Sequence, residues 1–75
     1  MAKYNGHPSW NAWNVSLWIN NDEYLYRTAY EYVTELGLAR ATKLLTERWG
    51  GSKTPDGGVF NSKTIRLALA DMELT

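Results

Sequence analysis

The segment that decides the fold is Trp10-Asn11-Ala12-Trp13-Asn14-Val15-Ser16-Leu17-Trp18-Ile19-Asn20-Asn21. These twelve residues, with three tryptophans and four asparagines, are compatible with either a helix or a strand, and the fold class depends on which of the two they form. From Trp13 to Asn20 apolar and polar side chains alternate, except at Trp18, and this period is typical of a half-buried strand. Ser9, by contrast, is a favourable N-cap at the position where a helix over about residues 10–20 would begin. No other segment offers an obvious partner strand. We therefore predict a helix, and a strand over residues 13–20 stays the alternative.

The next segment predicts a helix from its apolar spacing. Apolar side chains fall at i, i+4, i+7, i+8 and i+11, at Leu25, Ala29, Tyr32, Val33 and Leu36. Asn21 or Asp22 is suited to cap its start, and Gly37 to end it. Its solvent face is expected to carry Glu23, Arg27 and Glu31 at successive i, i+4 positions.

Two more helices follow, over Leu38 to Trp49 and over about Ser62 to Glu73. The inward stripe of the first is predicted as Leu38, Ala41, Leu45 and Trp49, joined at its edge by Leu44. The second is predicted to begin at a cap on Asn61 or Ser62 and to turn inward Ile65, Ala68, Leu69 and Met72. Between them residues 50–60 form a glycine-rich loop, predicted to be mobile, with a turn at Thr54-Pro55-Asp56-Gly57. Residues 1–8 are expected to form an extended arm. The predicted fold is all-α, a compact bundle of about four short helices.

Length and composition place the whole chain, residues 1–75, in one small domain. A chain of this size buries only about 60% of its unfolded surface, and without cysteines it has no disulfide to add stability. Four tryptophans, five tyrosines and a phenylalanine are expected to compensate. The formal net charge is zero, and the sequence contains no run of about 20 apolar residues and no secretion signal. We expect a soluble, cytoplasmic protein that does not enter a membrane.

The sequence offers little for catalysis. His7 is the single histidine and there is no cysteine, so no spacing exists to hold zinc or iron. Glu23, Glu31 and Glu35 follow one outward helix face instead of converging on a cleft, and no Gly-x-Ser-x-Gly elbow is present. We expect no cofactor, no metal site and no enzymatic activity.

The aromatic residues are the candidates for a protein-binding surface, since Trp and Tyr bring large contact area at low entropy cost. Tyr26 and Tyr30 are expected on one shoulder of their helix, at i, i+4, while Tyr24 projects into the polar face. The full candidate set is Trp10, Trp18, Tyr24, Tyr26 and Tyr30, and an exposed patch of them could also serve as a homodimer face. The alternative is that these aromatic rings cover the core instead of binding a partner. The asparagines of residues 10–21 are expected to be helix caps and surface amides.

Nucleic-acid binding is the second hypothesis. Basic residues fall on the third helix, the loop and the fourth helix, and Trp49 could stack on a base among them. The candidates are Arg40, Lys43, Arg48, Trp49, Lys53, Lys63 and Arg66. Glu47, Asp56 and Asp71 dilute this charge, so a near-neutral monomer would neutralise few phosphates.

The sequence resembles a family of small uncharacterised proteins encoded by tailed bacteriophages and prophages. The resemblance covers nearly the whole chain and is carried by Tyr4-Asn5-Gly6-His7, by Trp10-Asn11-x-Trp13-Asn14-Val15-x-Leu17-Trp18-Ile19-Asn20-Asn21-Asp22-Glu23-x-Leu25-Tyr26, by Thr54-Pro55-Asp56-Gly57 and by Thr64-Ile65-Arg66-x-Ala68-Leu69. Tyr24 stands where relatives often have glycine, so the resemblance assigns it no shared role. It implies a phage accessory protein that binds and modulates a host protein, for instance a defence component, in the cytoplasm of the infected bacterium.

Overall fold

The computed structural model describes residues 7–73, and in them the chain forms four helices. These are α1 (Trp10–Asn21), α2 (Glu23–Leu36), α3 (Leu38–Trp49) and α4 (Ser62–Glu73). The segment that decides the fold is therefore a helix, and the predicted all-α bundle is confirmed. Residues 1–6 of the predicted arm lie outside the described residues. No helix among residues 7–73 is long and apolar enough to cross a membrane.

Local hydrogen bonds explain where the helices begin and end. The Ser9 hydroxyl oxygen accepts from the Ala12 N–H at 3.1 Å, and the Asp22 carboxylate accepts from the Leu25 N–H at 3.0 Å. Of the two residues predicted to cap α2, the structure thus selects Asp22. Gly37, at φ 84°, separates α2 from α3, a conformation that favours glycine. Each helix is set by a residue adjacent to it in sequence, which is why its bounds could be predicted.

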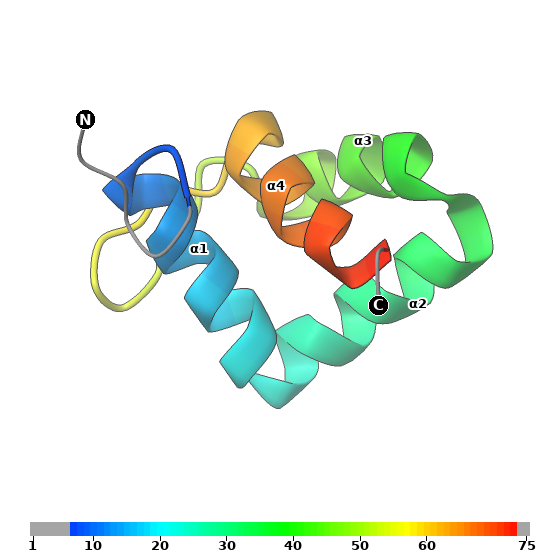
Figure 1. The fold of residues 1–75 in the computed structure, drawn as a ribbon, viewed down its shortest axis with the longest axis horizontal. Helices are drawn as coiled ribbons and strands as arrows, with labels where there is room; N and C mark the ends of the chain where they lie inside the picture. The colour runs from blue at the N-terminus through cyan, green and yellow to red at the C-terminus, as the bar shows by residue number, and fades with distance from the viewer. Residues whose placement is uncertain (1–6, 74–75) are drawn as a thin grey trace.

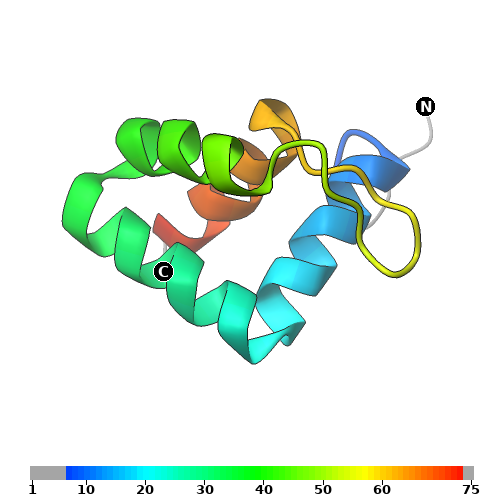
Figure 2. The same ribbon diagram turned by 180° about the vertical axis from the view of Figure 1, so that it is seen from behind.

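The helices enclose one core, with α4 packed against the other three (Figure 1). Seen from behind, α2 and α3 diverge from their corner at Gly37, and the segment after α3 runs across to α1 (Figure 2). The inward residues predicted for α4 are all buried, and the centre of the core is fully buried at Val15, Ile19, Ala29, Ala41, Leu45, Ile65, Ala68 and Leu69. Each helix contributes to this list, so the core depends on all four.

Two leucines assigned to the apolar stripes are not covered. Leu36 and Leu44 are each 37% exposed, although the periodicity placed them with the inward residues. Both lie where α2 and α3 face each other near their corner, and α4 covers other parts of the two helices. The apolar periodicity correctly predicted the two helices, but it did not predict that these two side chains would be exposed.

The segment between α3 and α4 is a short hairpin. Its two halves exchange backbone hydrogen bonds, Phe60 N–H to Ser52 O at 2.9 Å and Thr54 N–H to Gly58 O at 2.8 Å. The Gly57 N–H closes the predicted turn on Thr54 O at 2.9 Å, and Gly57 has φ 99°, as expected for the last residue of a three-residue hairpin loop. The predicted glycine-rich loop is thus a hairpin that is hydrogen-bonded to itself and, as described below, to α1.

We predict that Asp22→Ala destabilises the protein by about 1 kcal/mol, since α2 loses the acceptor for its first-turn N–H groups. Asn21→Ala is the matched control, because Asn21 is exposed, is adjacent, and caps nothing. Urea unfolding followed by circular dichroism measures both. Equal losses in the two variants would show that Asp22 does not act as a cap.

Candidate functional site

Two asparagines of α1 hold the hairpin in place. Asn11 pairs with the backbone of Val59 through both ends of its amide, accepting from the Val59 N–H at 2.6 Å and donating to the Val59 carbonyl at 3.1 Å. This side chain therefore satisfies a backbone donor and acceptor as a neighbouring strand would. Asn11 is half-buried, so the contact fixes the returning half of the hairpin to the helix.

Asn14 makes the deepest contact with the hairpin. Its side chain is 1% exposed, its carbonyl oxygen accepts from the Thr54 hydroxyl, and the Thr54 oxygen in turn accepts from the Gly58 N–H at 2.8 Å. Gly58 is required here by space, because a Cβ on it would lie 2.6 Å from the Asn14 oxygen. A buried amide left without partners would cost about 1–3 kcal/mol, so the hairpin and α1 depend on each other.

Asp56, at the hairpin tip, receives two donors from α1. The Trp18 indole N–H donates to its Oδ2 at 3.0 Å and the Asn14 amide donates to the same oxygen at 3.1 Å. These two hydrogen bonds, the one from Trp18 first, lower the pKa of the Asp56 carboxyl below its ordinary value. The carboxylate also fixes the orientation of the Trp18 ring, which is half-buried at the surface.

Trp18 forms one wall of a pocket of about 270 Å³ between α1, α2 and the hairpin. The other apolar walls are Leu25, Trp49, Pro55 and Phe60. Asp22 and Lys53 supply its charged groups, one of each sign. The pocket is smaller than the roughly 300–1,000 Å³ of sites that enclose a small molecule, and suits a single side chain.

A second surface aromatic is fixed in a similar way. Tyr24 is 57% exposed, and its hydroxyl oxygen accepts from the Arg48 guanidinium at 2.8 Å, which links the start of α2 to the end of α3. Arg48, by this hydrogen bond and then by its charge, lowers the pKa of the Tyr24 hydroxyl. Tyr24 was expected to project into the polar face of α2, and the structure adds that its hydroxyl is hydrogen-bonded to a residue of α3.

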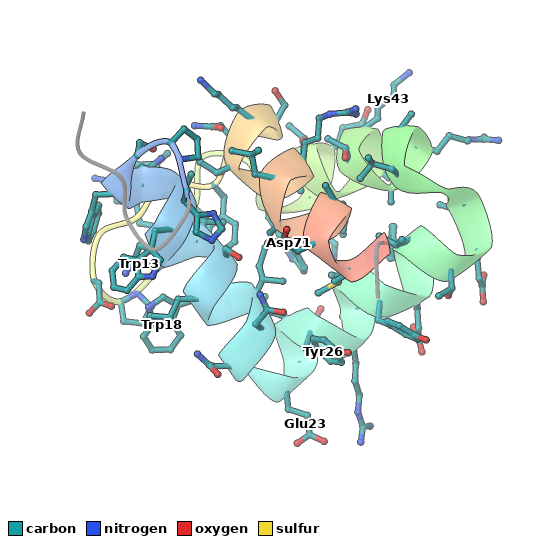
Figure 3. The ribbon with its side chains drawn as sticks, viewed as in Figure 1. Trp13, Trp18, Glu23, Tyr26, Lys43 and Asp71 are labelled. Atoms are coloured by element: carbon teal, nitrogen blue, oxygen red, sulfur yellow. The ribbon has the colours of Figure 1, made fainter. Side chains whose placement is uncertain are left out.

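The five aromatic candidates do not form one patch. Trp18 and Tyr24 each contact a charged residue of another segment, Asp56 and Arg48 respectively. Tyr26 and Tyr30 stack on each other along α2, with ring centroids 6.0 Å apart, and both are exposed. Trp10 is exposed at the start of α1. Figure 3 shows Trp18 and Tyr26 on the side of the molecule away from Lys43.

The basic candidates are also divided. Lys43 and Arg66 line an open hollow of about 460 Å³ between α3 and α4, together with Glu47. Arg48 is hydrogen-bonded to Tyr24, Lys53 lines the pocket beside Trp18, and Arg40 and Lys63 are exposed. Trp49 is only 8% exposed and packs edge-on against Phe60 at 5.9 Å, so its ring belongs to the core. The expectation that Trp49 could stack on a base is therefore corrected.

Sequence reasoning missed the residues that build this site. Asn11 and Asn14 were expected to be caps or surface amides, and Asp56 was treated as a turn residue. Asn11 and Asn14 are spaced i, i+3 and therefore lie on one helix face, and this spacing is the signal in the sequence that they could act together. Nothing in the sequence identified the hairpin as their partner. Among residues 7–73 no group of three or more His, Cys, Asp or Glu side chains is arranged to hold a metal ion.

The fold and the contact between α1 and the hairpin define a small protein of four helices, in which a hairpin is hydrogen-bonded to the first helix. The model of a family of unknown function, DUF7249, matches residues 1–74, and the chain belongs to that family. Searches of curated proteins and of solved structures give no match.

We predict that Asn14→Ala and Gly58→Ala each destabilise the protein by about 1–3 kcal/mol, the first by leaving Thr54 without its acceptor and the second by overpacking. The double variant should lose less than the sum, because removal of the Asn14 oxygen relieves the closest contact of the new Cβ. Urea unfolding of the four proteins gives the coupling.

Asn20→Ala is the control for this cycle, since Asn20 is exposed on the same helix and its amide bonds only within α1. Its effect should stay within about 0.5 kcal/mol. Additive losses at Asn14 and Gly58 would contradict the proposed contact.

We predict that Asp56 makes stability depend on acid pH. Its pKa is lower in the folded than in the unfolded protein, so its contribution is complete above the unfolded value of about 3.9 and is lost as the pH falls through the folded value. The free energy of unfolding should therefore fall less between about pH 5 and pH 2 in Asp56→Asn than in the wild type. Asp71→Asn, which removes an exposed carboxylate on α4, is the control matched in net charge.

Proposed function

We propose that this chain is a noncatalytic protein-binding module whose contact surface is centred on Trp18, Tyr24 and the pocket beside Trp18. The partner is a host protein, and the chain acts as an accessory protein of a phage or prophage in the bacterial cytoplasm. The resemblance to small phage proteins supports this context, and the arrangement of aromatic side chains supports the mode of action.

The observation that carries the proposal is that two aromatic rings at the surface are held by hydrogen bonds to charged groups. Trp18 donates to Asp56 at 3.0 Å, and Tyr24 accepts from Arg48 at 2.8 Å. Binding usually costs about 0.5–1.5 kcal/mol for each flexible side chain that becomes ordered. A ring already fixed avoids much of that cost and can act as an anchor, and Trp and Tyr are the residues most enriched among such anchors.

The pocket supplies a complementary feature. It is lined mainly by apolar side chains, opens at the surface and is of a size for one side chain of a partner. Trp49 and Phe60 form its inner wall and belong to the core, so the pocket is present before any partner arrives. A preformed apolar pocket beside a hydrogen-bonded surface tryptophan can receive an anchor side chain of the kind that packs at the centres of protein interfaces.

The proposal is tested by capture from a host lysate on the immobilised full chain. Trp18→Ala and Tyr24→Ala should each reduce the captured partner by at least about tenfold, the size expected for anchor residues. Circular dichroism must show that each variant is still helical, since Trp18 also contacts the hairpin.

Two matched substitutions serve as controls. Trp10→Ala and Tyr30→Ala remove exposed rings of the same types that lie outside the pocket, and capture should persist in both. If capture were lost in Trp10→Ala and Tyr30→Ala but kept in the Trp18 and Tyr24 variants, the contact surface would not be the one proposed. Recovery of nucleic acid that is released by salt, with no stoichiometric protein, would favour nucleic-acid binding instead.

A further inference from the structure

A second hollow lies between α2 and α3, close to their corner. Its floor is made by Tyr32, Leu36 and Leu44, and its volume is about 260 Å³. The two leucines are the apolar side chains that the bundle leaves uncovered, as noted above. Two carboxylates, Glu31 and Glu35, line the same hollow from α2.

These two carboxylates make no ion pair in the described part of the chain. About two turns earlier on α2, Glu23 is paired with Arg27 at 2.8 Å, but neither Glu31 nor Glu35 makes such a pair among residues 7–73. Like charges at i, i+4 on a helix destabilise it by a few tenths of a kcal/mol. Among the described residues no ion pair of Glu31 or Glu35 offsets this small cost.

The charge of this hollow distinguishes it from the other two. The pocket beside Trp18 has Asp22 and Lys53, and the hollow between α3 and α4 has Lys43, Arg66 and Glu47. The two charged residues that line the hollow between α2 and α3 are both acidic. Its apolar floor and single sign of charge select for an occupant that is apolar at its centre and basic on its edge.

We propose that this hollow docks a basic amphipathic helix of the partner, with one large apolar side chain between Leu36 and Leu44 and Lys or Arg side chains facing Glu31 and Glu35. The two glutamates are one i, i+4 step apart, about 6 Å along α2, and basic residues at the same spacing on a partner helix match that separation. The inference rests on the proposed function, since it names the chemistry of the protein that the module binds.

The probe is a synthetic amphipathic helix with leucines on one face and lysines at i, i+4 beside them, together with a control peptide in which every lysine is replaced by glutamate. The wild-type chain should bind the basic peptide and not the acidic one in a fluorescence anisotropy titration at low salt. Added salt should weaken the binding, because exposed charges are screened.

The double variant Glu31→Gln/Glu35→Gln should bind the basic peptide about tenfold more weakly, and Leu44→Ser should weaken it as well. Glu47→Gln/Asp71→Asn is the matched control, since it removes two exposed carboxylates outside the hollow and changes the net charge equally. All these positions are exposed, so the fold should tolerate the changes.

Several results would overturn the inference. In the peptide titrations these are equal binding of the two peptides, equal weakening by the two double variants, or no binding of the basic peptide. A dimer detected by light scattering and abolished by Leu44→Ser would also overturn it, because the occupant would then be a second copy of this chain. Capture of a host protein that depends on Trp18 but is unchanged in Glu31→Gln/Glu35→Gln would reject this inference and leave the proposed function intact. Absence of any captured protein would reject the proposed function itself.

Discussion

The structure depends on the buried amide of Asn14. This side chain joins α1 to the hairpin through Thr54 and Asp56, and its position requires glycine at residue 58. The hairpin in turn carries Phe60, which covers Trp49, and Thr64 at the start of α4 donates to the Val59 carbonyl. A hydrogen-bonded amide thus connects the first helix to the last, in a chain too small to rely on a large core and without a disulfide. Because a buried amide without partners is costly, this connection also disfavours alternative packings of the same helices.

The sequence was sufficient for the helices and insufficient for the contacts between distant segments. Ser9, Asp22 and Gly37 act on neighbouring residues, and apolar spacing reports which side of a helix is buried, so four helices could be predicted with nearly correct bounds. Asn11 and Asn14 bond to residues 48 and 40 positions away, and a single sequence carries no signal for such pairs. For the same reason the exposure of Leu36, predicted in the core, and of Leu44, predicted at the edge of its stripe, could not be foreseen, since periodicity describes one helix and does not say whether another element covers it.

The apolar side chains of α1 serve two different structural roles. Val15 and Ile19 face the core, while Trp18 faces the hairpin and uses its N–H to bind Asp56. An indole can satisfy an apolar wall and a carboxylate at once, because its ring is large and it has a single donor at one edge. That dual character accounts for a helix that is apolar on most of its surface. It also leaves one face of Trp18 in the wall of an open pocket, where the helix can contact a partner without unfolding anything.

The distribution of satisfied and unsatisfied charges separates structural from recognition surfaces. Asp56 receives two donors on one oxygen, and Asp22 accepts from the first turn of α2, so both carboxylates contribute to the fold. Glu31 and Glu35 accept no side-chain donor in the described part of the chain and border two exposed leucines. This acidic pair beside partly exposed leucines costs the fold some stability, because the like charges repel and 37% of each leucine remains exposed to water. Such a surface becomes favourable only when a basic and apolar segment covers it, which is the physical reason to assign it to a partner.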